Sequence, residues 1–230
     1  DKEELVGLLS YEDEPGVWFA VYDEDQTLKT EMATYFVNQF KDAQIIISDD
    51  DDMRNILNTL GYQQRDDWFD PITRFKLRDF EIPETEGYLI KSLDEDYRLD
   101  QIHYALYRGF DHGDDIEYSE KTLKEREYMT SSPNYNLRYA FVAHHEGHYV
   151  AFASVWYLKG SKTALVEPVA TVPEHRRKGL ARACIYKAIR EVFKDGAHDV
   201  FVGSERKVYQ DMGFEPFKRA YCFKKSKEVK

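Results

Sequence analysis

A short basic turn between an apolar strand and a helix is the segment of this sequence best suited to chemistry. Residues 164–172 read ALVEPVATV and favour a strand, Pro173 follows, and residues 176–182 read RRKGLAR. At such a turn the first N–H groups of the helix are unpaired, while the helix dipole and the basic side chains add positive charge. The sequence therefore predicts that this turn binds a phosphorylated ligand.

The same strand carries a side chain that suits proton transfer. Glu167 lies in the middle of the apolar stretch, and Pro168 follows it. A buried carboxylate without a partner is costly, and proline interrupts the hydrogen-bond ladder of a strand, so this point favours an irregular, exposed site. Glu167 is a candidate general base. The alternative is that it faces solvent or pairs with a basic neighbour.

The elements around the turn can be predicted from hydrophobic spacing. Leu180, Cys184, Ala188 and Val192 recur at steps of four and predict an amphipathic helix, and residues 199–203 read as a strand. This helix is expected to cross between two strands of one sheet. The turn lacks the Gly-Lys-Ser/Thr ending of a nucleoside-triphosphate loop and the three glycines of a dinucleotide fingerprint.

Two motifs together resemble the GNAT superfamily of acetyl-CoA-dependent N-acetyltransferases. Residues 176–181, RRKGLA, match its Arg/Gln-x-x-Gly-x-Gly/Ala loop, and residues 208–214, VYQDMGF, resemble its Leu-Tyr-x-x-x-Gly-Phe signature. The resemblance extends from residue 87 to the C-terminus. Ala181 replaces the commoner second glycine, and Ser204 stands where asparagine is frequent.

The resemblance implies an α/β fold with a mixed, mostly antiparallel sheet flanked by helices, and acetyl-CoA bound where the central strands splay apart. It implies catalysis by Glu167 as base and by Tyr209 as an acid that protonates the leaving thiolate, although an aromatic residue on a short helix also suits a core. The residues it implies for coenzyme binding are Ala170, Thr171, Val172, Arg176, Arg177, Lys178, Gly179, Leu180, Ala181, Arg182 and Ser204.

The implied reaction is acetyl transfer to a primary amine by direct attack in a ternary complex. A lysine-like amine has a pKa of about 10.4, so a base must remove its proton, and an oxyanion needs N–H donors. The acceptor is expected to be a small molecule or a peptide, with Asp111, His112 and Trp156 as candidate contacts. The alternatives are an ordinary loop at Asp111 and His112 and a packing role for Trp156. The alternative is a non-catalytic acyl-CoA-binding module that regulates or docks a partner.

The charge distribution divides the chain into two regions. Residues 1–86 carry 22 acidic and 8 basic side chains, a balance of −14, whereas residues 87–230 carry 21 acidic and 24 basic, a balance of +3. Residues 81–86 form a polar, proline-bearing link. We therefore predict a first domain over residues 1–83 and a second, the acetyltransferase domain, over residues 84–230.

The first domain is interpreted as the back half of a degenerate GNAT-like copy. Strands are expected at residues 5–11, 17–22 and 44–48, with helices at 28–40 and 53–60. The turn at residues 23–27, DEDQT, has three acids and no glycine, so it should repel a diphosphate and bind no coenzyme. The front of this copy is missing and the chain starts without methionine, so a longer parent protein is an open possibility.

Composition excludes several classes of protein. No apolar run could span a bilayer, the overall acidity argues against nucleic-acid binding, and His144, His145 and His148 do not converge on a metal ion. Cys184 and Cys222 are expected to be reduced thiols in a cytoplasmic protein. The sequence predicts no metal and no membrane or nucleic-acid partner, and leaves the oligomeric state and the identity of the amine open.

Overall fold

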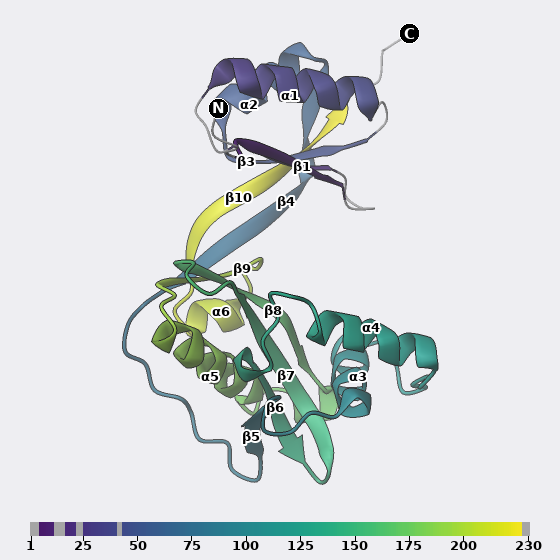
Figure 1. Cartoon of the computed structure of the whole chain (residues 1–230), viewed down its shortest axis with the longest axis vertical. Coiled ribbons are helices and arrows are strands. Elements are labelled where there is room, and N and C mark those ends of the chain that lie inside the picture. Colours follow the sequence, from purple (N-terminus) through teal and green to yellow (C-terminus); the bar gives the residue numbers. More distant parts are fainter. Residues whose placement is uncertain (1–4, 12–16, 22–24, 41–42, 227–230) are drawn as a thin grey trace. The chain divides into compact units, whose positions relative to one another are not determined.

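The computed structural model describes residues 5–11, 17–21, 25–40 and 43–226, and the chain divides into two units (Figure 1). The first unit comprises Asp1–Thr73, Gly203–Glu205 and Pro216–Lys230. The second comprises Arg74–Val202 and Arg206–Glu215. The structural division therefore falls at Thr73, ahead of the predicted link, and the C-terminal strand belongs to the first unit.

The first unit is a sheet covered by helices. Strand β1 (Gly7–Tyr11) pairs antiparallel with β2 (Val17–Val21), β2 pairs parallel with β3 (Ile45–Ser48), and β3 pairs antiparallel with β10 (Glu215–Lys225). Helices α1 (Gln26–Gln39) and α2 (Asp51–Thr59) flank β3 in the sequence, and β4 (Tyr62–Lys76) follows α2. The core contains Val17, Ala33, Phe36, Ile45, Ile47, Met53, Leu57, Tyr62 and Phe223.

The predicted strands and helices of this unit occur within a few residues of their expected ends. Strand β4 was not predicted, because Pro71 and the run of charges at residues 65–67 obscure the alternation expected of a strand.

Strand β10 corrects one expectation. Residues 217–224 fall within the second domain expected from the sequence, residues 84–230, but β10 pairs with β3 of the first unit, with Ala220 opposite Ser48 and Phe223 opposite Ile45. Successive side chains of a strand point to opposite faces of its sheet. The apolar residues of a strand can therefore be buried in any sheet whose faces are covered by other elements. The local pattern identifies a strand and does not identify its partner.

The second unit has the sheet order β9-β8-β7-β6-β5, antiparallel except for the β8–β9 pair. Its elements, in chain order, are β5 (Leu89–Ser92), α3 (Leu99–Gly109), α4 (Glu120–Thr130), β6 (Ala140–His145), β7 (His148–Tyr157), β8 (Thr163–Thr171), α5 (Leu180–Lys194), β9 (Asp199–Val202) and α6 (Lys207–Asp211). This mixed, mostly antiparallel sheet with helices confirms the predicted fold class.

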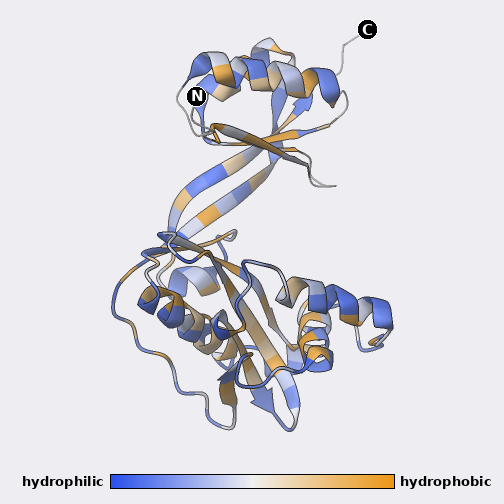
Figure 2. Cartoon of the chain, viewed as in Figure 1, coloured by the Kyte–Doolittle hydropathy of each residue, from blue (hydrophilic) through white to orange (hydrophobic). Residues whose placement is uncertain are grey.

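Helices cover both faces of this sheet. In β6, Phe141 and Ala143 join the core formed with α5, whereas Ala140 and Val142 join the core formed with α3. Because neighbouring strand residues point to opposite faces, α5 and α3 lie on opposite sides of the sheet. Figure 2 shows hydrophobic residues along the central strands and mostly hydrophilic residues on α4.

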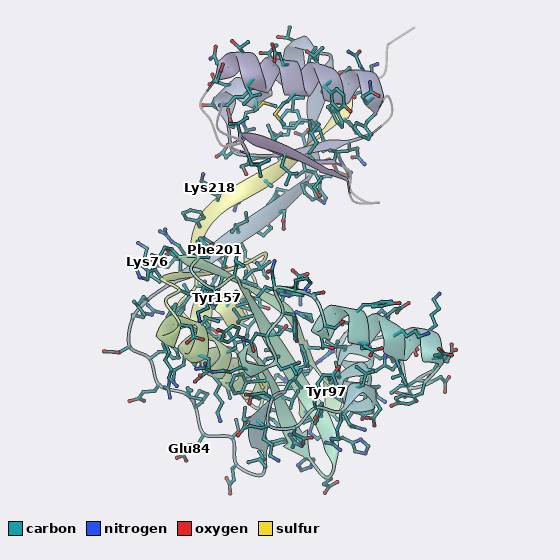
Figure 3. All side chains as sticks on the ribbon, in the orientation of Figure 1. Lys76, Glu84, Tyr97, Tyr157, Phe201 and Lys218 are labelled. Atoms are coloured by element: carbon teal, nitrogen blue, oxygen red, sulfur yellow. The ribbon has the colours of Figure 1, made fainter. Side chains whose placement is uncertain are left out.

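The C-terminal end of α5 is tied to the sheet by Tyr157 of β7 (Figure 3). The Tyr157 hydroxyl lies 2.9 Å from the carbonyl oxygen of Asp195, the C-cap residue of α5, and 3.2 Å from that of Ser161. This contact fixes the far end of the helix whose N-terminus opens on the basic turn. Within the described residues, no helix is long and apolar enough to cross a lipid bilayer.

Candidate functional site

The basic turn between β8 and α5 keeps the start of the helix open. After a short 3₁₀ helix (Pro173–His175), Arg177 and Gly179 adopt left-handed φ angles of 61° and 77°. Gly179 caps α5 without a side-chain hydrogen bond. The first N–H groups of a helix have no intrahelical partner. Those of α5 are therefore available to a ligand.

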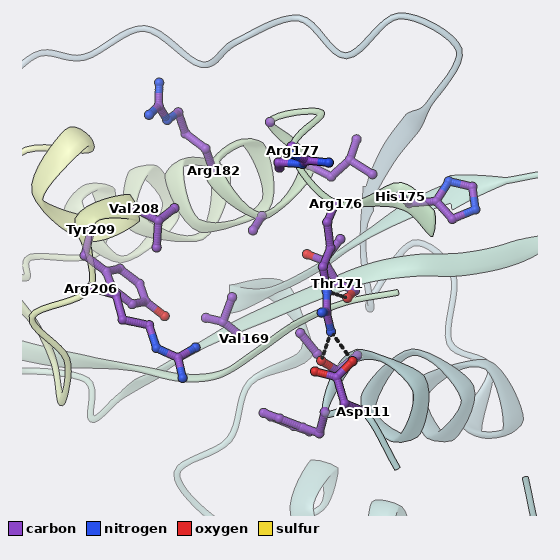
Figure 4. A pocket seen from close by; sticks show the side chains of 16 residues that line it. Asp111, Val169, Thr171, His175, Arg176, Arg177, Arg182, Arg206, Val208 and Tyr209 are labelled. Atoms are coloured by element: carbon purple, nitrogen blue, oxygen red, sulfur yellow. Dashed lines mark hydrogen bonds and ion pairs between the residues drawn. The ribbon is translucent and has the colours of Figure 1, made fainter. Parts of the chain in front are cut away.

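A cavity of about 760 Å³ opens at this turn (Figure 4). Four segments of the second unit surround it, namely the end of α3, the end of β8, the turn with the start of α5, and α6. The lining residues are Gly109, Phe110, Asp111, Val169, Ala170, Thr171, His175, Arg176, Arg177, Gly179, Leu180, Ala181, Arg182, Arg206, Val208 and Tyr209.

The charged lining of the cavity is predominantly basic. Arg177 and Arg182 come from the turn and the start of α5, and Arg206 extends from beside α6. A fourth arginine, Arg176, lies 2.7 Å from the carboxylate of Asp111. Guanidinium groups beside an uncapped helix N-terminus match the charge and the hydrogen-bond geometry of a diphosphate. The residues present therefore fit the coenzyme A diphosphate implied by the sequence motif.

Tyr209 places a phenol in this cavity. Its ring packs edge-on against Phe214, with 5.7 Å between ring centroids, and its hydroxyl points into the cavity (Figure 4). Burial raises the pKa of Tyr209 above its ordinary value of 10.0, with Arg206 opposing the rise. The phenol therefore stays protonated at neutral pH and can donate a proton.

Glu167 lies at an irregularity in β8. Ala153 of β7 pairs with Val169 and Val155 pairs with Val166, so two residues of β8, Glu167 and Pro168, face one residue of β7. This is a β-bulge. The Glu167 carbonyl accepts a hydrogen bond from the Ser154 hydroxyl, and the Glu167 side chain is exposed. Glu167 does not line the cavity, although Val169, two residues later, does.

The sequence profile of the acetyltransferase (GNAT) family matches residues 77–214, which is more than half of the chain. The chain belongs to the GNAT acetyltransferase family. The matched range coincides closely with the second unit, which is referred to below as the GNAT domain. A search of curated protein sequences found no match.

Solved GNAT structures share the fold. A GCN5-related N-acetyltransferase from Sphaerobacter thermophilus is 13% identical, with a TM-score of 0.66 over 90% of this chain and 71% of its own. A GCN5-related N-acetyltransferase from Kribbella flavida is 19% identical, with a TM-score of 0.60 over 94% and 80%. A tandem GNAT protein from the clavulanic acid biosynthesis pathway is 13% identical, with a TM-score of 0.66 over 97% and 79%. These identities establish the fold alone.

The cavity of the GNAT domain brings together most of the residues selected from the sequence, but not all. Val172 is buried, and Lys178 donates to the Tyr88 hydroxyl at 2.7 Å. His112 packs near Tyr107, and Trp156 packs edge-on against Tyr135. None of these four predicted residues lines the cavity, and neither does Ser204, which belongs to the first unit.

Several lining residues of the GNAT domain were not selected from the sequence. They are Gly109, Phe110, Val169, His175, Arg206 and Val208. Of these, Val208 begins the second motif, and Val169 lies in the strand that precedes the first. Gly109 and Phe110 end a helix far away in the sequence, and only the packing of α3 against β8 brings them to the cavity.

Both cysteines of the protein, Cys184 and Cys222, are free and buried. Burial raises the pKa of the Cys184 thiol from 9.0 to about 12, and burial also raises that of Cys222. The thiolate is the reactive form, so we expect Cys184 to react with Ellman's reagent about 10³-fold more slowly in the folded protein than after unfolding. Following both reactions at pH 8 tests this. Fast labelling of both thiols in the folded protein would contradict the buried position of Cys184.

Proposed function

We propose that the protein is an N-acetyltransferase that moves an acetyl group from acetyl-CoA to a primary amine by direct attack in a ternary complex. One observation carries the proposal: the uncapped start of α5 and the phenol of Tyr209 open on the same cavity. The start of α5 would bind the diphosphate of acetyl-CoA, and the Tyr209 phenol would lie beside the thiolate that leaves in the reaction.

The turn and the strand divide the binding of acetyl-CoA between them. Backbone N–H groups of residues 177–181 are proposed to hold the diphosphate, with added charge from the side chains of Arg177 and Arg182. Ala170 and Thr171, at the cavity end of β8, are proposed to bind the pantetheine arm through backbone hydrogen bonds, as an added strand would.

The chemical step requires two proton transfers. A C–N bond forms and the C–S bond of the thioester breaks. The amine proton passes to Glu167, directly or through water, and the Tyr209 phenol supplies a proton to the leaving thiolate. Backbone N–H groups near the bulge of β8 are proposed to bind the developing oxyanion. The burial of Cys184 and Cys222 supports direct attack, because a covalent acetyl-cysteine route needs an accessible thiol.

The first unit is proposed to be a degenerate partial GNAT-like domain that binds no coenzyme. Helix α1 lies between strands β2 and β3 in the sequence, as α5 lies between β8 and β9 in the GNAT domain. The Asp25 carboxylate accepts from the N–H groups of Thr27 at 2.7 Å and Leu28 at 3.3 Å. The Asp25 carboxylate satisfies the first N–H groups of α1 and would repel a phosphate. Gly179 has no side chain to cap α5, so the first N–H groups of α5 stay open to a ligand.

We propose that the protein acts in the cytoplasm, a reducing compartment in which its two free thiols would persist.

The proposed function predicts that small amines, peptides or aminoglycosides accelerate the release of free coenzyme A thiol from acetyl-CoA. For an amine that supports turnover, Glu167→Gln should lower kcat by about 10²-fold, because the neutral amide cannot accept the amine proton. Thiol detection with each amine of a panel, for both proteins, provides the measurement. Binding of acetyl-CoA without amine-dependent thiol release would instead favour a non-catalytic acyl-CoA-binding module.

A further inference from the structure

Arg176, the first residue of the coenzyme motif, makes its hydrogen bonds within the protein. Its Nη2 donates to the Asp111 carboxylate at 2.7 Å and to the Gly109 carbonyl at 3.0 Å. Its Nε donates to the Thr171 carbonyl at 3.0 Å. Figure 4 shows the guanidinium directed toward Asp111 at the end of α3. The Arg176 side chain therefore connects the basic turn to the residues at the end of α3 that line the cavity.

A second connection runs beside the first. The Glu174 carboxylate, in the 3₁₀ helix just before the basic turn, accepts from Arg108 of α3 at 2.7 Å, and the other terminal nitrogen of Arg108 lies 2.6 Å from Asp114. Arg108 is largely buried, with 15% of its side chain exposed. Asp114 is thus held to Arg108 and through it to Glu174, while Gly109 and Asp111 are held directly to Arg176.

The geometry favours an internal role for Arg176 over phosphate binding. A guanidinium presents its donors in a fixed planar fork, and this fork serves two backbone carbonyls and one carboxylate. Turning it toward a diphosphate would leave all three oxygens without this donor. Arg177 and Arg182 also line the cavity, and they can supply positive charge without breaking these bonds.

We propose that Arg176 is a positioning residue that fastens the segment 109–114, whose first three residues line the cavity, to the basic turn, and that it does not bind the phosphates. The inference rests on the proposed function, because it takes this segment to border the acceptor amine. Arg176 and Asp111, which the sequence assigned separately to coenzyme and acceptor, then act as one pair.

Amide hydrogen exchange reports on this pair directly. The N–H groups of Phe110, Asp111 and His112 donate to carbonyls of the last turn of α3, so their exchange measures opening of the segment. We expect Arg176→Gln and Asp111→Asn each to speed this exchange by about tenfold. Both should change the acetyl-CoA Kd, measured by calorimetry, by less than about threefold.

The matched control is Arg177→Gln, which removes a neighbouring cavity arginine. It should weaken acetyl-CoA binding by about tenfold and leave the exchange of residues 110–112 unchanged. With an amine that supports turnover, Arg176→Gln and Asp111→Asn should raise the KM for the amine about fivefold, with little change in the KM for acetyl-CoA. Arg176→Lys keeps the charge without the fork and should rescue neither exchange nor this KM.

The opposite pattern would overturn the inference. If Arg176 binds phosphate, Arg176→Gln weakens acetyl-CoA binding about tenfold, while Asp111→Asn releases Arg176 and leaves the affinity equal or tighter. A wild-type protein without affinity for acetyl-CoA would overturn the proposed function itself, and the role of Arg176 with it. That result is distinct, because it requires no variant.

Discussion

Replacing Tyr209 with phenylalanine is expected to lower kcat by about 10²-fold while the acetyl-CoA Kd stays nearly unchanged. The substitution removes one hydroxyl from the cavity and keeps the ring that packs against Phe214. Without a proton donor, the leaving thiolate must depart unprotonated, so the loss falls on the chemical step and spares binding. Thiol-release kinetics and calorimetry on the same preparations separate the two effects.

The pH profile sharpens this expectation. Burial holds the pKa of Tyr209 above 10.0, so the phenol keeps its proton throughout the neutral range and loses it only as the pH rises through the raised pKa. Activity of the wild type should therefore fall at high pH, and the profile of Tyr209→Phe should lack this fall. The control is Tyr128→Phe on the exposed face of α4, which should keep full activity. Equal kcat in wild type and Tyr209→Phe would eliminate the general-acid role.

Replacing Gly109 with alanine is expected to destabilise the GNAT domain by about 2–3 kcal/mol. A Cβ at this position would lie 2.6 Å from the Ala170 Cβ and 2.9 Å from the backbone nitrogen of Thr171. Neither neighbour can move without shifting β8, so α3 must move away from the strand. Because Ala170 and Thr171 line the cavity, acetyl-CoA binding should weaken in the same variant.

Urea denaturation measures the loss of stability, and Gly203→Ala provides the matched control. The nearest atom to a Cβ at Gly203 lies 3.8 Å away, an ordinary van der Waals distance, so this substitution should change the free energy of unfolding by less than about 0.5 kcal/mol. Indistinguishable midpoints for the two variants would show that α3 does not approach β8 as closely as described.

The local elements of this protein could be predicted from short stretches of sequence. The spacing of Leu180, Cys184, Ala188 and Val192 predicts α5, and all four side chains are buried. The basic turn before that helix could also be predicted, because a proline, a glycine and adjacent basic residues act within one turn of backbone. These signals lie within a few residues, so no knowledge of the rest of the chain is needed.

The candidate site could be predicted only in part. Arg177, Gly179 and Tyr209 belong to continuous motifs, and all three line the cavity. Gly109 and Phe110 also line it but belong to no motif, because they reach the cavity only through the packing of α3 against β8. Glu167 was selected as a base from its unusual place in an apolar strand, and the structure places it at a bulge with its side chain exposed.

Short stretches of sequence were enough to place helix α5 and the basic turn before it, because helix periodicity and turn chemistry act over neighbouring residues, and the resemblance of two motifs to the GNAT superfamily implied the fold of the second unit. The pairing of β10 with β3, and the contact of Arg176 with Asp111, 65 positions earlier, depend on the folding of the whole chain. The sequence of a strand indicates which residues share a face, but it does not indicate which strand lies beside it. Likewise, an arginine has a known charge, but its hydrogen-bond acceptor cannot be predicted from the residues around it. Both partners are chosen by contacts between distant segments, which no local pattern contains.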